Sequence, residues 1–394
     1  MLNDILFYAK KNEDSLIALR RELHKVPEIG GELPKTRKIV CDYLDSIGIP
    51  YTLNPNDDGV IAEIKGGKDG KTLAFRADMD GLHIDEQNDY PFKSVIDGQM
   101  HGCGHDVHTA ILLITAKLLN EYKENLYGNV RLIFQSGEET GTGAKEMLKL
   151  GVLDGVDAVC ALHVGNIAGD EHNAGDVIVL PGPVSAGKNK FSITVIGKGG
   201  HSAFPHKAIN PIIAAAKIVE RCHCMMQNDY KDKAAVLTIA TFNSGIDHNT
   251  IPEKAVLKGS IRVQDKDVRK EIGEKLGEIA AISSKEFGAT CEFELKWGSE
   301  TVMNNPQLSA LVTKACKNIL GDKNVITELP RPLMGSDDFT NYAALRPSVY
   351  FFLHTNNSDK GIVETNHNPR FDVDESVLWR GVAAYIAITK EFLS

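Results

Sequence analysis

Apolar residues in the first half of the chain follow two alternating rhythms, short continuous runs and longer stretches with helical spacing. The short runs predict strands at 59–64, 72–77, 129–134 and 156–164. Between the second and third of these runs, Ile111, Ile114 and Leu118 recur at helical spacing and predict a helix over 106–122. Strands that alternate with helices are typical of an α/β fold, so we expect a mainly parallel sheet with helices on both faces.

The rhythm changes after a stretch rich in proline and glycine at 179–187. The elements expected next are a strand, a helix, two strands, a helix and a strand, at 190–197, 207–227, 234–242, 254–263, 266–287 and 291–297. This βαββαβ order is that of a complete ferredoxin-like unit. We therefore predict that residues 186–298 form an inserted domain and that residues 1–185 and 299–394 together form one discontinuous α/β domain.

The last part of the chain returns to the α/β pattern. It predicts a helix near 305–320, a strand at 348–354 and a final helix near 374–391. At 394 residues the chain exceeds what one hydrophobic core usually supports, which agrees with two domains. Its 42% apolar and 25% charged residues are close to globular averages and argue against a disordered or fibrous protein.

Charge and cysteine content exclude several classes of partner and compartment. The net charge is -9, whereas nucleic acids and anionic membranes bind basic surfaces, so we expect neither as a partner. No segment approaches the ~20 consecutive apolar residues of a membrane span. Seven scattered cysteines, an odd number, favour free thiols over a disulfide framework. Because Asp4 also precedes any apolar run, we expect no secretory signal and a cytoplasmic location.

Chemically active residues gather at the predicted strand ends, where functional groups of open parallel sheets collect. Asp78 and Asp80 follow the strand at 72–77, and the adjacent pair Glu138 and Glu139 follows the strand at 129–134. Three further segments contribute His163 in the strand at 156–164, His367 in the loop after the strand at 348–354, and Cys103 and His105 around a glycine before the helix at 106–122.

Thiolate, imidazole and carboxylate groups together are the ligands of zinc and other divalent first-row metals. Five candidate ligands come from four separate segments: Cys103, His105, Glu139, His163 and His367. One ion needs roughly four ligands, so five ligands plus water predict two divalent ions per chain. The donor set suits Zn²⁺ or Mn²⁺, with Co²⁺ or Ni²⁺ as alternatives.

Other interpretations of these residues stay open at this point. Cys103 is alternatively a buried small apolar residue, or a nucleophile paired with a histidine, but a nucleophile leaves the pair Glu138 and Glu139 unexplained. Two carboxylates beside a metal can instead divide the work, since one coordinates while the other takes a proton from water. Asp78 suits a ligand or a supporting role equally, and His108 is expected to make local hydrogen bonds or to face solvent.

Seven motifs in their order along the chain resemble the M20 metallopeptidase family and its amidohydrolase branch. They are "RADMDG", "HGCGHD", "GEE", "LHV", "GKGGHS", "GSDDF" and "HNPRF". That branch holds N-acyl-L-amino acid amidohydrolases, hippurate hydrolases, auxin-conjugate hydrolases and N-acetyl-diaminopimelate deacetylases. The resemblance extends from residue 22 to residue 375, nearly the whole chain.

The resemblance implies a role for each candidate residue. Cys103 would bridge two metals whose shells are completed by the four other candidate ligands, His105, Glu139, His163 and His367. Glu138 would be the general base, and Asp80 would orient a ligand. His201 would cross a dimer interface to stabilise the oxyanion in the partner's site, and three further residues would contact substrate: Asn249, Gly335 and Ser336. The inserted domain would then serve as a lid and dimerisation domain of a homodimer.

The function implied is a dinuclear metal-dependent amidohydrolase that cleaves N-acyl amino acids, with acetyl, benzoyl or similar acyl groups, to a carboxylic acid and a free amino acid. A metal-dependent dipeptidase or carboxypeptidase of the same family is an alternative. A non-catalytic metal-containing protein that binds a small ligand is a third. Departures from the family pattern, such as Asp337 in place of a glutamate and His83 in place of a proline, affect the shape of the pocket and leave the acyl group and amino acid undetermined.

Overall fold

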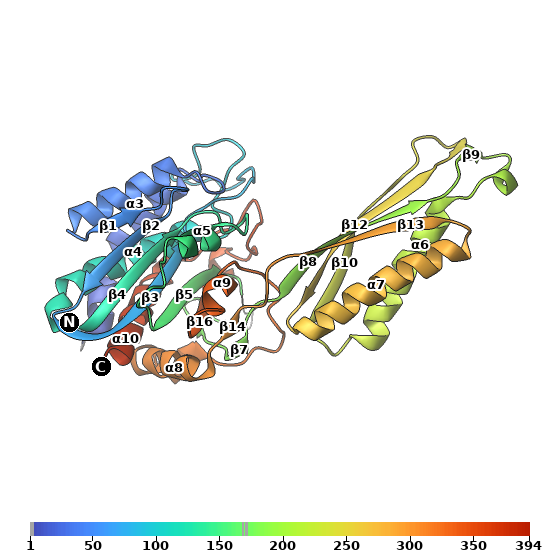
Figure 1. Cartoon of the computed structure of the whole chain (residues 1–394). Helices are drawn as coiled ribbons and strands as arrows, with labels where there is room; N and C mark the ends of the chain where they lie inside the picture. Colours follow the sequence, from blue (N-terminus) through green and yellow to red (C-terminus); the bar gives the residue numbers. More distant parts are fainter. Residues whose placement is uncertain (1–3, 168, 170–171) are drawn as a thin grey trace. The chain divides into compact units, whose positions relative to one another are not determined.

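The computed structural model describes residues 4–167, 169 and 172–394, and the chain divides into two compact units (Figure 1). Unit 1 comprises Met1–Gly182, Met303–Arg331 and Asp337–Ser394. Unit 2 comprises Pro183–Val302 and Pro332–Ser336. The inclusion of Pro332–Ser336 in unit 2 differs from the expected range 299–394 of the α/β domain, because side chains of unit 2 bind the carbonyl groups of this segment.

Unit 1 contains an eight-stranded sheet in the order β1-β2-β4-β3-β5-β16-β6-β15. Its strands are β1 Tyr51–Leu53, β2 Val60–Lys65, β3 Lys68–Asp78, β4 Tyr127–Gln135, β5 Ala158–Gly165, β6 Val177–Ile178, β15 Val325–Ile326 and β16 Ser348–His354. The four central strands β4, β3, β5 and β16 run parallel, whereas β1, β2 and β6 pair antiparallel with their inner neighbours. The expected α/β fold with a mainly parallel sheet is confirmed.

Helices of unit 1 pack on this sheet and on one another. They are α1 Ile5–Lys11, α2 Glu13–His24, α3 Pro34–Ser46, α4 His105–Glu121, α5 Gly143–Lys149, α8 Pro306–Leu320, α9 Thr340–Ala343 and α10 Trp379–Phe392. Helix α4 contacts β3, β5 and α10, and every residue from His105 to Ala116 is buried. A helix that is apolar on nearly all sides belongs in the core, which fixes the position of its first residue, His105.

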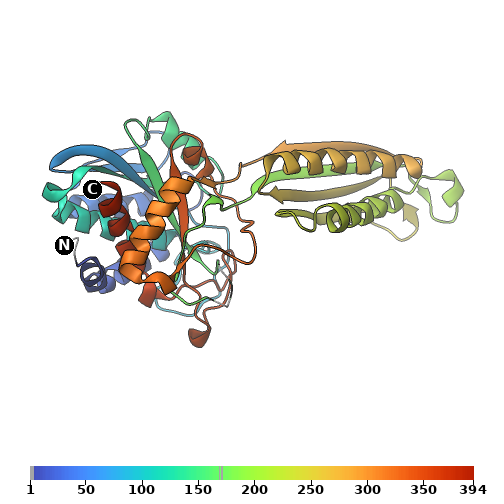
Figure 2. The ribbon, with the colours of Figure 1, turned by 90° about the horizontal axis from the view of Figure 1, so that it is seen from below.

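Unit 2 consists of β8 Gly187–Ile196, α6 Pro211–Asp229, β10 Ala235–Ser244, β12 Lys254–Val263, α7 Lys266–Glu286 and β13 Thr290–Trp297. Its sheet is antiparallel in the order β10-β12-β8-β13. Burial alternates along β8, and α6 and α7 cover the buried face (Figures 1 and 2). Period-two burial is what a sheet covered on one face requires.

Several short elements complete the chain: β7 Gly182–Pro183, β9 Gly200–His201, β11 Thr250–Ile251 and β14 Met303–Asn304. The final helix, α10, begins five residues later than the sequence predicts. The Asp374 side chain accepts a hydrogen bond from the backbone of Ser376 and starts a short 3₁₀ turn, Glu375–Val377, ahead of the helix. Within the described residues, no helix combines the length and apolar character needed to cross a bilayer.

Candidate metal centre

The central parallel strands bring the sequence-predicted residues of unit 1 to one edge of the sheet. β3 ends at Asp78, and its neighbours β4 and β5 end at Gln135 and Gly165. Because parallel strands end at the same edge, the residues that follow them meet there. Asp80 and Glu138 therefore contact each other, and His163 lies two residues before the end of β5, although the three are far apart in sequence.

The start of α4 fixes two more candidates. Gly104, between Cys103 and His105, has a φ of 87° and is the N-cap of the helix. A Cβ atom at this position would lie 2.5 Å from Cγ2 of Val164, so only glycine fits both the backbone conformation and the close approach to β5. This turn places the side chains on both sides of Gly104 against the end of β5.

Two groups of three potential ligands share one sulfur atom. The ligand atoms of Cys103, His105 and His163 lie within 4.8 Å of one another, and so do those of Cys103, Glu139 and His367. The Cys103 Sγ atom is 3.5 Å from Nε2 of His163. The structure thus brings together all five ligands that the sequence predicts, and Cys103 occupies the position common to both groups.

Several buried ligand atoms in this cluster have charged neighbours but no well-formed hydrogen bond. Within the described part of the chain, both ring nitrogens of His105 and the Oε1 atom of Glu139 meet no hydrogen-bond partner in good geometry; they face only ion-pair groups, at 3.4 and 3.6 Å for His105 and 3.2 Å for Glu139. Leaving such atoms unsatisfied costs about 1–3 kcal/mol each. A coordinated divalent cation would satisfy them, so the residues present fit a metal.

His367 is held in an unusual backbone conformation. It has a φ of 69°, a left-handed value uncommon for residues other than glycine, and its N–H donates to the carbonyl of Gly102 at 2.7 Å. Its Nε2 atom lies 3.2 Å from Oε1 of Glu139. Strained conformations of this kind cluster at functional sites, where the surrounding contacts impose them.

His163 is oriented so that one nitrogen faces the cluster. Its Nδ1 atom lies 2.8 Å from the carbonyl oxygen of Val164 and donates to it, which leaves the lone pair of Nε2 toward Cys103. Burial and the neighbouring His108 lower the pKa of His163 well below its usual value. A neutral imidazole with a free lone pair is the form that binds a metal.

Asp78 and His108 support the cluster from behind. His108 is buried, and its Nδ1 lies 2.5 Å from Asp78, while its Nε2 accepts from the backbone N–H of Val164 at 2.8 Å. Both ring nitrogens of His108 are therefore engaged in the core by residues 30 and 56 positions away, so it neither makes the expected local hydrogen bonds nor faces solvent. Asp78 also lies 3.6 Å from Nε2 of His105 and could equally share a cation with it.

Asp80 connects the candidate base to a candidate ligand. Its carboxylate accepts from the backbone N–H groups of Glu138 and Glu139 at 3.1 and 3.0 Å, and lies 3.4 Å from Nδ1 of His105. Carboxylates that hold a ligand histidine in this way are typical outer-shell groups of metal sites.

Glu138 lies in a buried acidic environment. It is 8% exposed, and its carboxylate is within 4.8 Å of those of Asp337 and Asp338. Burial, followed by the charges of Asp337, Glu139 and Asp338, raises the pKa of Glu138 well above its usual value. A buried cation, Arg76, balances part of this charge, because it lies 2.9 Å from Asp338 and 3.3 Å from Asp337. Sequence reasoning missed Arg76 and Asp338, although both stand inside quoted motifs.

The cysteine-nucleophile alternative receives no support from this environment. Cys103 is 8% exposed, and burial raises the pKa of its thiol to about 12. Catalytic cysteines have lowered pKa values and partial exposure.

The remaining candidates belong to unit 2. His201 in β9 pairs with Thr250 of β11, and Ser202 N donates to the carbonyl of Asn249 at 3.0 Å, so His201 and Asn249 lie side by side. Both side chains are exposed. Gly335 and Ser336 end the segment Pro332–Ser336, in which the carbonyl of Gly335 accepts from Ala186 N at 2.7 Å.

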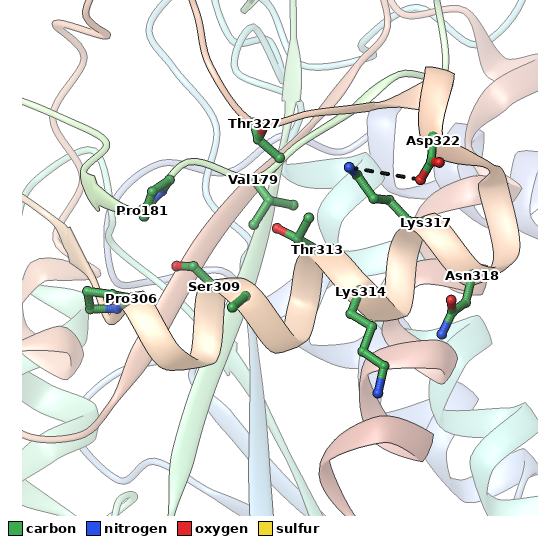
Figure 3. Close-up of a pocket in the computed structure, with 11 residues that line it drawn as sticks. Val179, Pro181, Pro306, Ser309, Thr313, Lys314, Lys317, Asn318, Asp322 and Thr327 are labelled. Carbon is green, nitrogen blue, oxygen red and sulfur yellow. Dashed lines mark ion pairs between the residues drawn. The ribbon is translucent and has the colours of Figure 1, made fainter.

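A cavity of about 620 Å³ lies elsewhere in unit 1, along α8 (Figure 3). Its lining includes Ser309, Thr313 and Lys317, the last of which pairs with Asp322 at 3.9 Å. None of its lining residues belongs to the metal cluster, and we assign it no part in the chemistry.

The fold and a cluster of this composition beside paired carboxylates define a class of enzyme, the metal-dependent hydrolases. The model of peptidase family M20/M25/M40 matches residues 74–391, and the chain belongs to this family. The expected membership of the M20 family, with relatives in its amidohydrolase branch, and the expected hydrolysis of amide bonds are confirmed.

Three relatives show how the similarity is distributed. The chain is 36% identical over 385 residues to thermostable carboxypeptidase 1 of Saccharolobus solfataricus, covering 96% of both chains. It is 35% identical over 365 residues to N-acetylcysteine deacetylase of Bacillus subtilis, covering 92% of this chain and 93% of the relative. The crystal structure of the Bacillus subtilis YXEP protein, a dinuclear metal-binding peptidase of the M20 family, has a TM-score of 0.82 and 33% identity, covering 98% and 99% of the two chains.

Proposed function

We propose that the protein is a dinuclear metal-dependent amidohydrolase that cleaves N-acyl amino acids to a carboxylic acid and a free amino acid. The observation that carries this proposal is the position of Glu138 beside two ligand groups that share Cys103. The deacetylase relative supports an N-acylated substrate. The YXEP protein, whose name records two metals, supports the dinuclear site.

The two ligand groups divide the five residues between two ions. Cys103, His105 and His163 would hold one, while Cys103, Glu139 and His367 would hold the other. Two divalent ions bound there, Zn²⁺ or Mn²⁺ with Co²⁺ or Ni²⁺ also suited, would polarise the amide carbonyl and make water more acidic.

Glu138 moves the proton in this proposal. Its carboxylate takes a proton from the attacking water and delivers it to the nitrogen of the leaving amine. The raised pKa of Glu138, caused first by burial and then by neighbouring carboxylates, makes this carboxylate a stronger base than an exposed glutamate. Asp80 holds the backbone of Glu138 in place during both steps.

His201 is the proposed donor to the oxyanion. The backbone N–H of Ala203 donates to its Nδ1 at 3.1 Å, so the neutral ring carries its proton on Nε2, where it can donate. Asn249, Gly335 and Ser336 are proposed substrate contacts. We also propose that the protein is a homodimer and that unit 2 is its ferredoxin-like lid and dimerisation domain. In this dimer, unit 2 supplies His201 to the site of the partner. The outer strands β10 and β13 of its sheet offer edges for pairing.

A carboxypeptidase or dipeptidase is the second candidate, because thermostable carboxypeptidase 1 is as similar to the chain as the deacetylase. The two activities differ in whether the preferred acyl group carries a free α-amine. A non-catalytic binding protein is the third candidate, and Glu138 beside a full ligand set argues against it. A cytoplasmic location remains a prediction that rests on the seven free cysteines.

Product release measured by mass spectrometry tests the proposal. Metal-reconstituted protein is offered N-acetyl and N-benzoyl amino acids, N-acetyl-diaminopimelate and simple dipeptides. Cleavage of the acylated amino acids supports the amidohydrolase proposal. A preference for dipeptides instead supports the peptidase alternative. Absence of any product from protein that retains metal would support the binding protein.

A further inference from the structure

Residues 332–338, which we call the strap, contain a boundary between the two units. Pro332–Ser336 group with unit 2, whereas Asp337 and the residues after it group with unit 1. Ser336 and Asp337 are consecutive in the sequence. The two ends of the strap are therefore held by different units, with one peptide bond between them.

Unit 2 holds its end of the strap by three successive carbonyl groups. Gln264 Nε2 donates to the carbonyl of Leu333 at 3.0 Å, and Arg262 Nη1 donates to that of Met334 at 2.9 Å. The carbonyl of Gly335 accepts from the backbone of Ala186 at 2.7 Å. The strap adopts no regular secondary structure there, so these bonds determine its path.

Unit 1 holds the other end through two side chains: Asp337, which accepts from the Tyr350 hydroxyl at 2.6 Å and lies 3.3 Å from Arg76, and Asp338. Asp338 is 4% exposed, and its carboxylate accepts from Arg76 at 2.9 Å, from Gln135 at 2.8 Å and from the backbone N–H of Ala144 at 2.9 Å. These three donors approach the carboxylate from three different elements, β3, β4 and α5. The side chain of Asp338 is thereby fixed.

The backbone of Asp338 reaches the candidate base. Its N–H donates to Oε1 of Glu138 at 3.3 Å. Glu138 otherwise faces the carboxylates of Asp337 and Asp338, which repel it. A fixed donor in such surroundings selects the direction in which the carboxylate of Glu138 points.

We propose that the strap positions Glu138, and that the hold of unit 2 on residues 333–335 regulates this positioning. The inference rests on the proposed function, in which Glu138 is the general base. Asp338 is then a positioning residue, because it acts through Glu138. A displacement of about 1 Å in a reacting group can cost about a hundredfold in rate, so a small shift of the strap is enough to control the reaction.

The test weakens the hold of unit 2 without changing any residue of unit 1. The double variant Arg262→Ala with Gln264→Ala removes two of the three donors to the strap. Lys258→Ala is the matched control, because Lys258 is an exposed cation on the same face of β12, four residues before Arg262. The measurements are kcat, KM, metal content, and amide hydrogen exchange of peptides that cover 337–343.

We expect kcat of the double variant to fall about ten- to hundredfold while KM and metal content stay within about twofold of wild type. Amide exchange at 337–343 becomes faster. Gln264→Ala alone gives a smaller change in the same direction, and Lys258→Ala leaves all four quantities unchanged. The single variant Gln264→Ala keeps the test valid if the double variant folds poorly.

Three results would overturn the inference. Unchanged kcat, even with faster exchange, would show that the strap does not position Glu138. A rise in KM alone would mean that Arg262 and Gln264 bind substrate. Loss of metal in parallel with kcat would place the effect on the metal centre. The exchange measurement needs no substrate, so it remains informative if the wild type hydrolyses none of the compounds. In that case the proposed function fails, but faster exchange in the double variant still supports the anchoring of the strap by unit 2. Unchanged exchange overturns it.

Discussion

The candidate residues of unit 1 and unit 2 differ in how far the protein itself buries them. In unit 1, His105 is 1% exposed and Glu138 8%. In unit 2, His201 and Asn249 are exposed, and the nearby Phe204 remains 51% exposed. Hydrogen-bond donors stabilise charge far better in surroundings that exclude water. Most of the proposed site of unit 1 is therefore buried by that unit itself, with His367 as the exposed exception, whereas the residues that unit 2 is proposed to contribute are open to solvent.

The strongest test of this contrast is Glu138→Gln. It removes the proton acceptor but keeps the shape of the side chain and all five proposed ligands. We expect kcat to fall about 10²–10⁴-fold, the usual contribution of a general base, while metal content is unchanged. Steady-state kinetics with elemental analysis of the same samples measures both. Near-normal turnover by the metal-loaded variant would remove Glu138 from the mechanism.

A change in unit 2 gives the next largest effect. His201→Ala should lower kcat about 10²–10³-fold, the cost of one oxyanion donor, without loss of metal. Because His201 is proposed to act in the partner's site, mixed dimers of the inactive His201→Ala and Glu138→Gln chains should regain activity. Activity is measured after subunit exchange has been confirmed with tagged chains. No recovery in verified mixed dimers would place His201 in its own chain's site or outside the reaction.

The support behind the cluster gives a moderate effect. His108→Ala removes the bond to Asp78 and leaves the N–H of Val164 without its acceptor, next to the proposed ligand His163. Loss of such outer-shell partners typically weakens metal affinity about 10–100-fold. Competition with a chelator measures the change, and His206→Ala, an exposed histidine of unit 2, is the control. Unaltered affinity would make His108 a core residue only.

The last prediction concerns not activity but stability, in a second buried region of unit 1. Both ring nitrogens of His24 face carboxylates, Asp106 at 2.7 Å and Glu86 at 3.2 Å. Burial and Arg20 lower the pKa of His24, but Asp106 and Glu86 outweigh them and raise it. Its stabilising contribution is therefore complete below the unfolded pKa of about 6.5 and is lost as pH rises through the folded value.

His24→Gln should accordingly cost about 3 kcal/mol in the free energy of unfolding on the acidic side of neutrality and less in alkali. Urea unfolding of both proteins at about pH 6 and about pH 9 measures the two differences. An equal cost at both pH values would mean that His24 keeps one charge state across this range, which would contradict the expected loss of its stabilising contribution.

The sequence predicted the parts of the molecule that depend on local patterns. The longer strands were found because they form continuous apolar runs, and α4 because its apolar residues have helical spacing. The cluster was found because Cys103, Glu139 and His163 stand at strand or helix ends. The short strands β1, β6 and β15 and the helices α1–α3, α5 and α9 were missed, although Leu16, Leu19 and Leu23 of α2 have helical spacing. The spacing of apolar residues alone does not show which helical segments pack in the folded domain.

Long-range contacts explain the other omissions. The role of Arg76 is visible only in the folded protein, where its Nη2 atom lies 2.9 Å from Oδ1 of Asp338, a residue 262 positions later in the chain. The assignment of Pro332–Ser336 to unit 2 likewise depends on Arg262 and Gln264, which no periodicity connects to that segment. Such charge networks are visible only once tertiary packing is known.

Metal stoichiometry tests the central claim, two ions sharing Cys103, most directly. Elemental analysis after reconstitution and removal of free metal should give two ions per chain for the wild type. His163→Ala and His367→Ala should each lose one ion, because each removes a ligand from one group only, and Cys103→Ala should lose both. One ion in the wild type, or two in Cys103→Ala, would contradict the account.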